Sequence, residues 1–190
     1  PHWCTRTRRA SQLRTSSGPT TAPGPAPVTA ALDRAAADHP TRVATDFLGA
    51  VTTYADLARR VSHAAEALRR LGVGPGDRVA LVLPNCTTHV VAFYAVLRLG
   101  AVVVEHNPTY TAGELAHQLA DSGAVVALVW EKTVDRVLEV AGRTDVRTVV
   151  AVDLTRDLPW AKRAALRLPV TSARTARTSM RSPVAGARCA

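Results

Sequence analysis

The sequence TYADLARRVSHAAEALRRLGVGPGDRVALVLPN, residues 53–85, places a helical pattern directly before a strand pattern. Its first half carries apolar residues at helical spacing, and one stripe holds Tyr54, Leu57, Val61, Ala65, Leu68 and Leu71. Thr53 is suited to cap the start of this helix, and Asp56, three residues later, is suited to bond back to the capping residue. Gly72 is suited to end the helix. Arg78–Leu83 is an unbroken apolar run, which is typical of a strand buried on both faces of a parallel sheet.

The same alternation of helix and strand continues on both sides of this stretch. Downstream, the patterns predict helices at 87–99, 111–121 and 133–141 and strands at 101–104, 125–130 and 148–152. Upstream, they predict a helix at 28–39 and a hairpin of 42–48 and 50–53 that turns at Gly49. Strand–helix–strand repetition of this kind predicts an α/β fold, a three-layer sandwich with a mainly parallel sheet.

The two ends of the chain differ in composition from its middle. Residues 1–28 are rich in Arg, Ser, Thr and Pro, and we expect them to be a disordered extension. Residues 29–157 form the expected α/β domain, and 158–190 form a basic tail. We expect that tail to be disordered, apart from a helical turn or two near 161–168.

The net charge of +9 comes from these ends and not from the middle of the chain. Residues 1–32 hold four arginines and no acid, and residues 158–190 hold seven basic groups and no acid. Residues 33–157 hold the remaining 13 basic groups and all 15 acidic groups. Neither end has repeated aromatics or an apolar period for a recognition helix, so specific nucleic-acid binding is disfavoured. Unspecific attraction of polyanions to the tails stays as a minor alternative.

Cysteine usage and hydropathy bear on where the protein works. Cys4, Cys86 and Cys189 are far apart, and the sequence has no Cys-x-x-Cys pair. This pattern favours the reducing cytoplasm over a disulfide framework or a zinc knuckle. No uninterrupted apolar run reaches the length of about 18 residues that a membrane-spanning helix needs. The Arg-rich beginning is similar to a transit peptide, but we favour an unstructured extension.

Two stretches deserve comparison with phosphate-binding loops. Gly72-Val-Gly-Pro-Gly76 follows a helix and precedes a strand, whereas a phosphate loop must follow a strand and open a helix. We therefore interpret it as a turn. The segment Asn107–Glu114 does follow a strand and precede a helix, which is where a ligand crevice forms in an open α/β sheet. Because Thr111 and Glu114 form a capping box that uses the free amides, a structural loop is the favoured interpretation.

Other chemically active side chains give little support for a site. Glu105, His106, Glu114 and His117 could be combined into a metal site, but the further Glu-x-x-His pairs that a di-metal centre needs are missing. We expect His63 and His89 on helix surfaces, and Cys86 as a small, partly buried residue at a helix start. We likewise expect Arg59, Arg60, Arg69 and Arg70 to form a solvated face. No Gly-x-Ser-x-Gly motif supports a serine hydrolase.

The phrases Asn107-Pro-x-Tyr-Thr and Glu114-Leu-x-x-Gln118-Leu-x-Asp-Ser-Gly123 resemble the opening of the AMP-forming acyl-CoA synthetases, most of all the long-chain fatty-acid–CoA ligases. The resemblance covers about Ala30 to Asp153, and the last twenty or so residues do not share it. It implies the N-terminal subdomain of the adenylate-forming fold. It also implies a ligase that joins a carboxylic acid to a thiol by way of ATP, Mg²⁺ and coenzyme A.

The same resemblance implies residues that this sequence lacks. The family's phosphate loop ends in Lys, but neither Lys132 nor Lys162 follows a Gly/Ser/Thr-rich loop, and the sequence has no Thr-Glu pair for magnesium. We therefore assign no catalytic, cofactor-binding or metal-binding residue. The prediction is a truncated synthetase that is inactive alone and prone to self-association. The alternative is a non-catalytic α/β module that binds a partner or a nucleotide.

Overall fold

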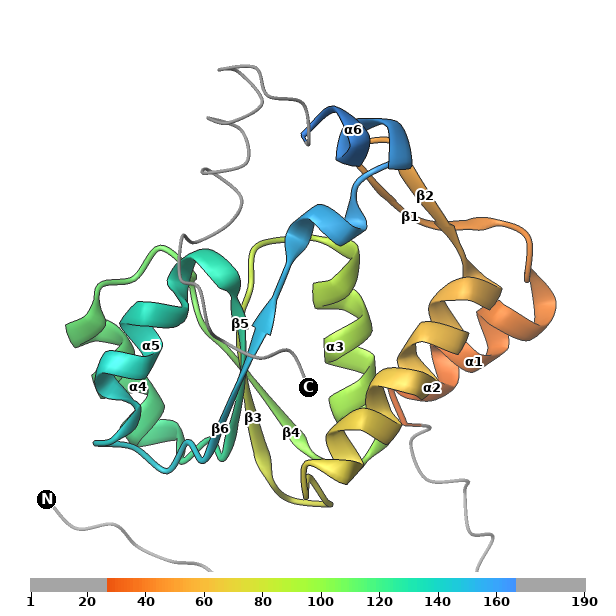
Figure 1. The fold of residues 1–190 in the computed structure, drawn as a ribbon. Coiled ribbons are helices and arrows are strands. Elements are labelled where there is room, and N and C mark those ends of the chain that lie inside the picture. The colour runs from red at the N-terminus through yellow and green to blue at the C-terminus, as the bar shows by residue number, and fades with distance from the viewer. Residues whose placement is uncertain (1–26, 167–190) are drawn as a thin grey trace, which may run out of the picture.

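The computed structural model describes residues 27–166. Four parallel strands form its main sheet in the order β4-β3-β5-β6. They are β3 (Arg78–Val82), β4 (Val102–Glu105), β5 (Val126–Trp130) and β6 (Thr148–Val152). Helices α1 (Thr29–Asp38), α2 (Tyr54–Arg70) and α3 (Thr87–Arg98) lie on one side of the sheet, and α4 (Ala112–Ser122) and α5 (Val134–Ala141) lie on the other (Figure 1). The predicted three-layer α/β sandwich is confirmed.

The central strand β3 divides the core into two apolar clusters, one on each face of the sheet. Val79 and Leu81 belong to the cluster under α2 and α3, and Ala80 and Val82 belong to the cluster under α4 and α5. All four side chains are fully buried. Because successive residues of a strand point to opposite faces, an unbroken apolar run supplies both cores at once.

The long helix α2 begins at Tyr54, as the sequence predicts, and ends at Arg70, one residue before the predicted end at Leu71. The Thr53 hydroxyl accepts a hydrogen bond from the Asp56 backbone N–H at 3.2 Å and donates one to the Asp56 carboxylate at 3.0 Å. The Asp56 carboxylate therefore bonds back to the Thr53 side chain, whereas in a capping box it would accept from the backbone N–H of the capping residue. At the other end, Val73 N–H donates to Leu68 C=O, and Gly72 has a φ of +87°. This is the Schellman arrangement, in which glycine is favoured.

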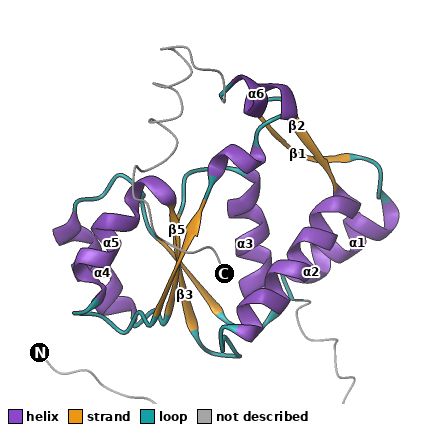
Figure 2. Ribbon diagram, in the orientation of Figure 1, coloured by secondary structure: helices purple, strands orange, loops and turns teal. Residues whose placement is uncertain are grey.

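A separate hairpin of β1 (Val43–Phe47) and β2 (Ala50–Thr53) lies beside the helices that precede the sheet (Figure 2). Its turn holds Leu48 at a φ of +54° and Gly49 at +88°. Asp46 accepts a hydrogen bond from the Gly49 N–H at 2.8 Å. The predicted hairpin around Gly49 is confirmed, with a non-glycine residue at a positive φ as an unexpected addition.

Short helical turns complete the chain around the sheet. The 3-10 turns η1 (Glu131–Thr133) and η2 (Leu154–Asp157) follow β5 and β6, and α6 (Trp160–Ala165) comes after η2. Lys162 of α6 donates to the Leu48 carbonyl at 2.7 Å and so ties α6 to the hairpin.

Three details differ from the prediction or fall outside the described part. The strand predicted at 101–104 is β4, which lies one residue later. Leu71, predicted on the buried stripe of α2, is 37% exposed because it lies past the last turn of that helix. The expected disorder of residues 1–28 and 158–190 concerns mostly residues 1–26 and 167–190, which lie outside the described residues.

Candidate functional site

The carboxyl ends of β3 and β4 border a hollow of about 500 Å³. Its polar lining includes His89 from α3 and Glu105 and His106 from the end of β4. His89 Nε2 lies 2.9 Å from Glu105 Oε1. The His89 side chain is 19% exposed, so it lies on α3 as predicted but is partly buried, and it pairs with Glu105. His63 is exposed, as predicted.

The loop from Asn107 to Glu114 beside this hollow is held by its own hydrogen bonds. Asn107 Oδ1 accepts from the Thr109 N–H at 2.9 Å, and the Glu114 carboxylate accepts from the Thr111 N–H at 2.8 Å. Hydrogen bonds from Thr111 also hold the pKa of Glu114 below its usual range. Arg136 donates to the Tyr110 carbonyl at 2.6 Å. The capping box is confirmed, and these bonds support a structural loop.

The side chains considered for a metal site take part in separate interactions. Glu105 pairs with His89, and His106 Nδ1 lies 2.9 Å from Gln118 Oε1. Glu114 is engaged in the capping box, and His117 is exposed on α4. Within residues 27–166, no three His, Cys, Asp or Glu side chains come close enough together to hold a metal ion. The four side chains considered for a metal site therefore do not form one cluster.

Cys86 lies at the start of α3, as predicted, and its surroundings make it a poor nucleophile. Its sulfur accepts a hydrogen bond from the His89 N–H at 3.3 Å. The side chain is buried, and burial raises the pKa of the thiol to about 11. Because the thiolate is the reactive form, this thiol is mostly unreactive at neutral pH.

The described residues also do not fit a triphosphate. The glycines from Gly72 to Gly76 connect the end of α2 to β3, which is the geometry of a turn. Lys132 Nζ lies 5.6 Å from the centre of the Trp130 ring, and Lys162 binds the Leu48 carbonyl. Neither lysine lies on a glycine-rich loop at a helix start, where phosphate groups bind. We derive no step of a phosphate reaction from these residues.

A buried ion pair that the sequence did not predict joins α2 to the segment after β6. Arg60 Nη2 lies 2.8 Å from Asp157 Oδ1, and the Thr88 N–H at the start of α3 donates to Asp157 Oδ2 at 2.6 Å. The Asp157 side chain is 1% exposed. The prediction of a solvated face is therefore wrong for Arg60. For Arg59, Arg69 and Arg70, whose side chains are more than half exposed, it is confirmed.

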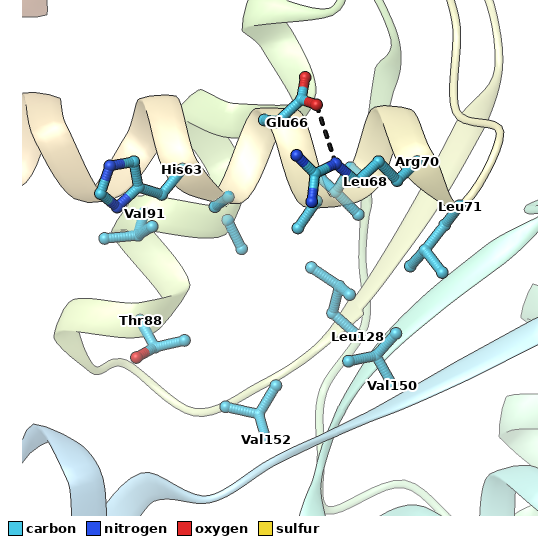
Figure 3. Close-up of a pocket in the computed structure, with 13 residues that line it drawn as sticks. His63, Glu66, Leu68, Arg70, Leu71, Thr88, Val91, Leu128, Val150 and Val152 are labelled. Carbon is cyan, nitrogen blue, oxygen red and sulfur yellow. Dashed lines mark hydrogen bonds and ion pairs between the residues drawn. The ribbon is translucent and has the colours of Figure 1, made fainter. Parts of the chain in front are cut away.

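An apolar groove lies between α2, α3 and the strands β5 and β6 (Figure 3). Its volume is about 590 Å³, which is in the range of ligand pockets. Its apolar lining includes Leu68 and Leu71 of α2, Val91 of α3, Leu128 of β5, and Val150 and Val152 of β6. His63, Glu66 and Arg70 line its α2 side. No sequence motif pointed to this groove.

Comparison with known proteins assigns the fold. The family model described as AMP-binding enzyme matches residues 32–183, which reaches past the point where the sequence resemblance was expected to end. A long-chain-fatty-acid–CoA ligase of Yersinia pestis is 40% identical over 116 residues, which is 60% of this chain and 21% of that protein.

Solved structures agree with this assignment. The Mycobacterium tuberculosis fatty acyl CoA synthetase superposes on 67% of this chain with a TM-score of 0.61 and 26% identity, and 27% of that chain is covered. A benzoate CoA ligase from Burkholderia xenovorans superposes on 65% of this chain with a TM-score of 0.60 and 29% identity, and 25% of that chain is covered.

Two further facts limit the assignment. The chain spans about a fifth to a quarter of the length of the curated relatives it matches. Of the helices between residues 27 and 166, none combines the length and the apolar character that crossing a membrane requires.

Proposed function

The chain belongs to the AMP-binding enzyme family, and from this premise we propose that it is the N-terminal part of an AMP-forming acyl-CoA synthetase. The full-length protein would join a fatty acid to ATP, giving an acyl-adenylate and pyrophosphate. The thiol of coenzyme A would then displace AMP and form the thioester. We expect the complete enzyme to work in the cytoplasm on a carboxylic acid, ATP with Mg²⁺, and coenzyme A.

One observation carries this proposal. The family model matches residues 32–183 of this chain. The curated relatives are four to five times longer than the segment of them that aligns with it. Relatives from Yersinia pestis and Haemophilus influenzae, aligned over 116 and 140 residues, are named long-chain-fatty-acid–CoA ligases, which supports a fatty acid as the substrate class. Within this frame, residues 29–157 are the α/β domain, with 1–28 and 158–190 as its basic flanks.

We further propose that this chain contributes scaffold and carries no catalytic, cofactor-binding or metal-binding residue of its own. In support, Lys162 binds the Leu48 carbonyl, Lys132 lies over the Trp130 ring, and no three His, Cys, Asp or Glu side chains of the described residues form a group that could hold a metal ion. Catalysis of adenylation depends on positioned groups that neutralise the phosphate charges. A scaffold without those groups leaves the reaction uncatalysed.

The test is an assay of the purified full chain with ATP, Mg²⁺, oleate and coenzyme A. We expect no pyrophosphate release above the rate without protein, and no saturable ATP binding by calorimetry. Pyrophosphate release that depends on oleate would contradict the proposed inactivity. A chimera tests the family activity separately: this chain replaces the aligned segment of the Yersinia pestis ligase, and we expect the product to form oleoyl-CoA.

The alternative is a non-catalytic α/β module that binds a partner or a nucleotide, with the apolar groove as its candidate binding surface. An independent module would have to keep this groove in water without aggregating. Size-exclusion chromatography distinguishes the two proposals. A compact monomer at high concentration favours the module. Self-association favours a scaffold whose surfaces are exposed because the rest of the enzyme is absent.

A further inference from the structure

The segment that follows β6 is the last part of the described chain that packs into the core. In η2 and directly after it, Leu154, Asp157 and Leu158 are buried. From Trp160 to Ala165, by contrast, every residue of α6 is exposed. Figure 1 shows this segment running from the end of β6 past the start of α3 towards the hairpin. The described chain therefore leaves its buried course at one defined point, at the end of η2.

Asp157 joins this point to two helices at once. Its Oδ1 lies 2.8 Å from Arg60 Nη2 of α2, and its Oδ2 accepts a hydrogen bond from the Thr88 N–H of α3 at 2.6 Å. Arg60 Nη2 also donates to Thr88 Oγ1 at 3.2 Å. One planar carboxylate is thus held at both of its oxygens by partners on different helices. Because hydrogen bonds are directional, this attachment fixes the rotation of η2 as well as its distance from the helices.

Stability alone gives little reason for this arrangement. Replacing a buried ion pair by apolar side chains of similar volume is often neutral or stabilising, because both charges lose their water on burial. Leu154 and Leu158 already supply apolar contacts on either side of Asp157. Apolar attraction is non-directional, whereas the ion pair accepts one orientation. What the pair adds is therefore a fixed position of the chain where it leaves the core.

We propose that Asp157 is a positioning residue of the full-length synthetase, which together with Arg60 and Thr88 sets the direction in which the chain leaves this scaffold. The inference rests on the proposed function, in which the phosphate chemistry lies in the part of the ligase that this chain does not contain. The family model continues to residue 183, so the segment beyond η2 belongs to the matched region. Because misplacing reacting groups by about 1 Å can cost about 100-fold in rate, a loosened exit slows the reaction although Asp157 touches no substrate.

The main alternative is that Asp157 only caps α3. Cys86 Sγ accepts the His89 N–H at 3.3 Å, and Asp157 Oδ2 would then satisfy another free amide of the same first turn. A cap needs one oxygen and no cation, whereas the second oxygen of Asp157 also binds Arg60. The two roles differ in their consequences, since a cap affects the stability of the protein whereas positioning affects the turnover of folded enzyme.

The experiment uses the chimera in which this chain replaces the aligned segment of the Yersinia pestis ligase. Asp157→Asn keeps the shape of the side chain and an oxygen for the Thr88 N–H, but it removes the charge that pairs with Arg60. The double variant Arg60→Met with Asp157→Leu replaces the pair by apolar side chains. Val137→Ala is the control, because Val137 is fully buried under α5 on the opposite face of the sheet, and its truncation lowers stability without touching the pair. Urea denaturation and initial rates of oleoyl-CoA formation are measured for each variant.

We expect Asp157→Asn to lower kcat by at least about tenfold while the KM for ATP changes by less than about threefold, because the pair acts on geometry and not on substrate binding. The double variant should regain stability but keep the low kcat, since apolar contacts do not fix the orientation of η2. Val137→Ala should keep the kcat of the unchanged chimera at temperatures where it is folded. An unchanged kcat in Asp157→Asn overturns the proposal. A kcat that returns together with stability in the double variant also overturns it, because that is the behaviour of a cap.

A second measurement needs no activity and uses the chain alone. The Arg156 N–H and the Leu158 N–H donate to carbonyls of Asp153 and Thr155, so their hydrogen exchange reports opening of η2. We expect these amides to exchange at least about tenfold faster in Asp157→Asn than in the unchanged chain, and at a similar rate in the Val137→Ala control.

The two measurements separate the positioning role from the proposed function. Equal exchange in Asp157→Asn and the unchanged chain overturns the proposal whatever the chimera does. A chimera that forms no oleoyl-CoA with Asp157 intact contradicts the proposed function instead, and the exchange rates then decide whether Asp157 anchors the chain.

Discussion

Replacing Arg60 by Ala should destabilise the protein far more than removing a neighbouring arginine. Arg60 pairs with Asp157, whose side chain is 1% exposed, so the loss of Arg60 leaves a buried carboxylate without its cationic partner, although it still accepts a hydrogen bond from the Thr88 N–H. Removing one member of a buried ion pair costs about 3–5 kcal/mol. The Arg60 side chain is 35% exposed, and water can therefore reach part of the site. We expect a loss of about 3 kcal/mol, at the lower end of that range.

This loss is large enough to measure by urea denaturation. With a denaturant dependence of about 2 kcal/mol per molar, it lowers the unfolding midpoint by about 1.5 M. Arg69→Ala is the matched control, because Arg69 is on the same helix but its side chain is 62% exposed. Its midpoint should stay close to that of the unchanged protein. The double variant Arg60→Ala with Asp157→Ala should recover part of the loss, since neither charge is then left unpaired.

Equal midpoints for Arg60→Ala and Arg69→Ala would refute this reasoning. Such a result would mean that Asp157 is solvated, or that η2 does not hold its carboxylate against the start of α3. A strictly additive double variant would also show that the two side chains act independently.

Three further predictions concern single positions. Folding raises the pKa of Cys86 from 9.0 to about 11, so the stability that the neutral thiol contributes is fully present below pH 9 and declines as the pH rises towards 11. Cys86→Ala should remove this decline, which is measured by urea denaturation at each pH. Gly72→Ala should lower the free energy of unfolding by about 1 kcal/mol, because Gly72 has a φ of +87°. Gly113→Ala should raise it by up to about 1 kcal/mol, because Gly113 lies inside α4 and alanine favours a helix. Thermal unfolding of the two variants compares these effects. Leu48→Asn should stabilise the hairpin by about 1 kcal/mol, because Asn tolerates a positive φ before Gly49, and a lower melting temperature would contradict this.

Most of the fold could be predicted because its signals are local. The helical stripe of α2, the cap at Thr53 and the stop at Gly72 all lie within one segment. The unbroken run of β3 likewise announces a strand covered on both faces. Errors arose at the ends of segments, where Leu71 leaves the helix and β4 begins one residue late.

The sequence by itself determined the order of helices and strands, because apolar residues recur along it every 3.6 residues in the helices and every 2 residues in the strands. Only the tertiary structure decided which surfaces meet. Arg60 and Asp157 are 97 positions apart, and no local pattern pairs them. The apolar groove likewise arises from four elements that come together only in space. Periodicity fixes which face of an element is apolar, but packing decides which of those faces are covered.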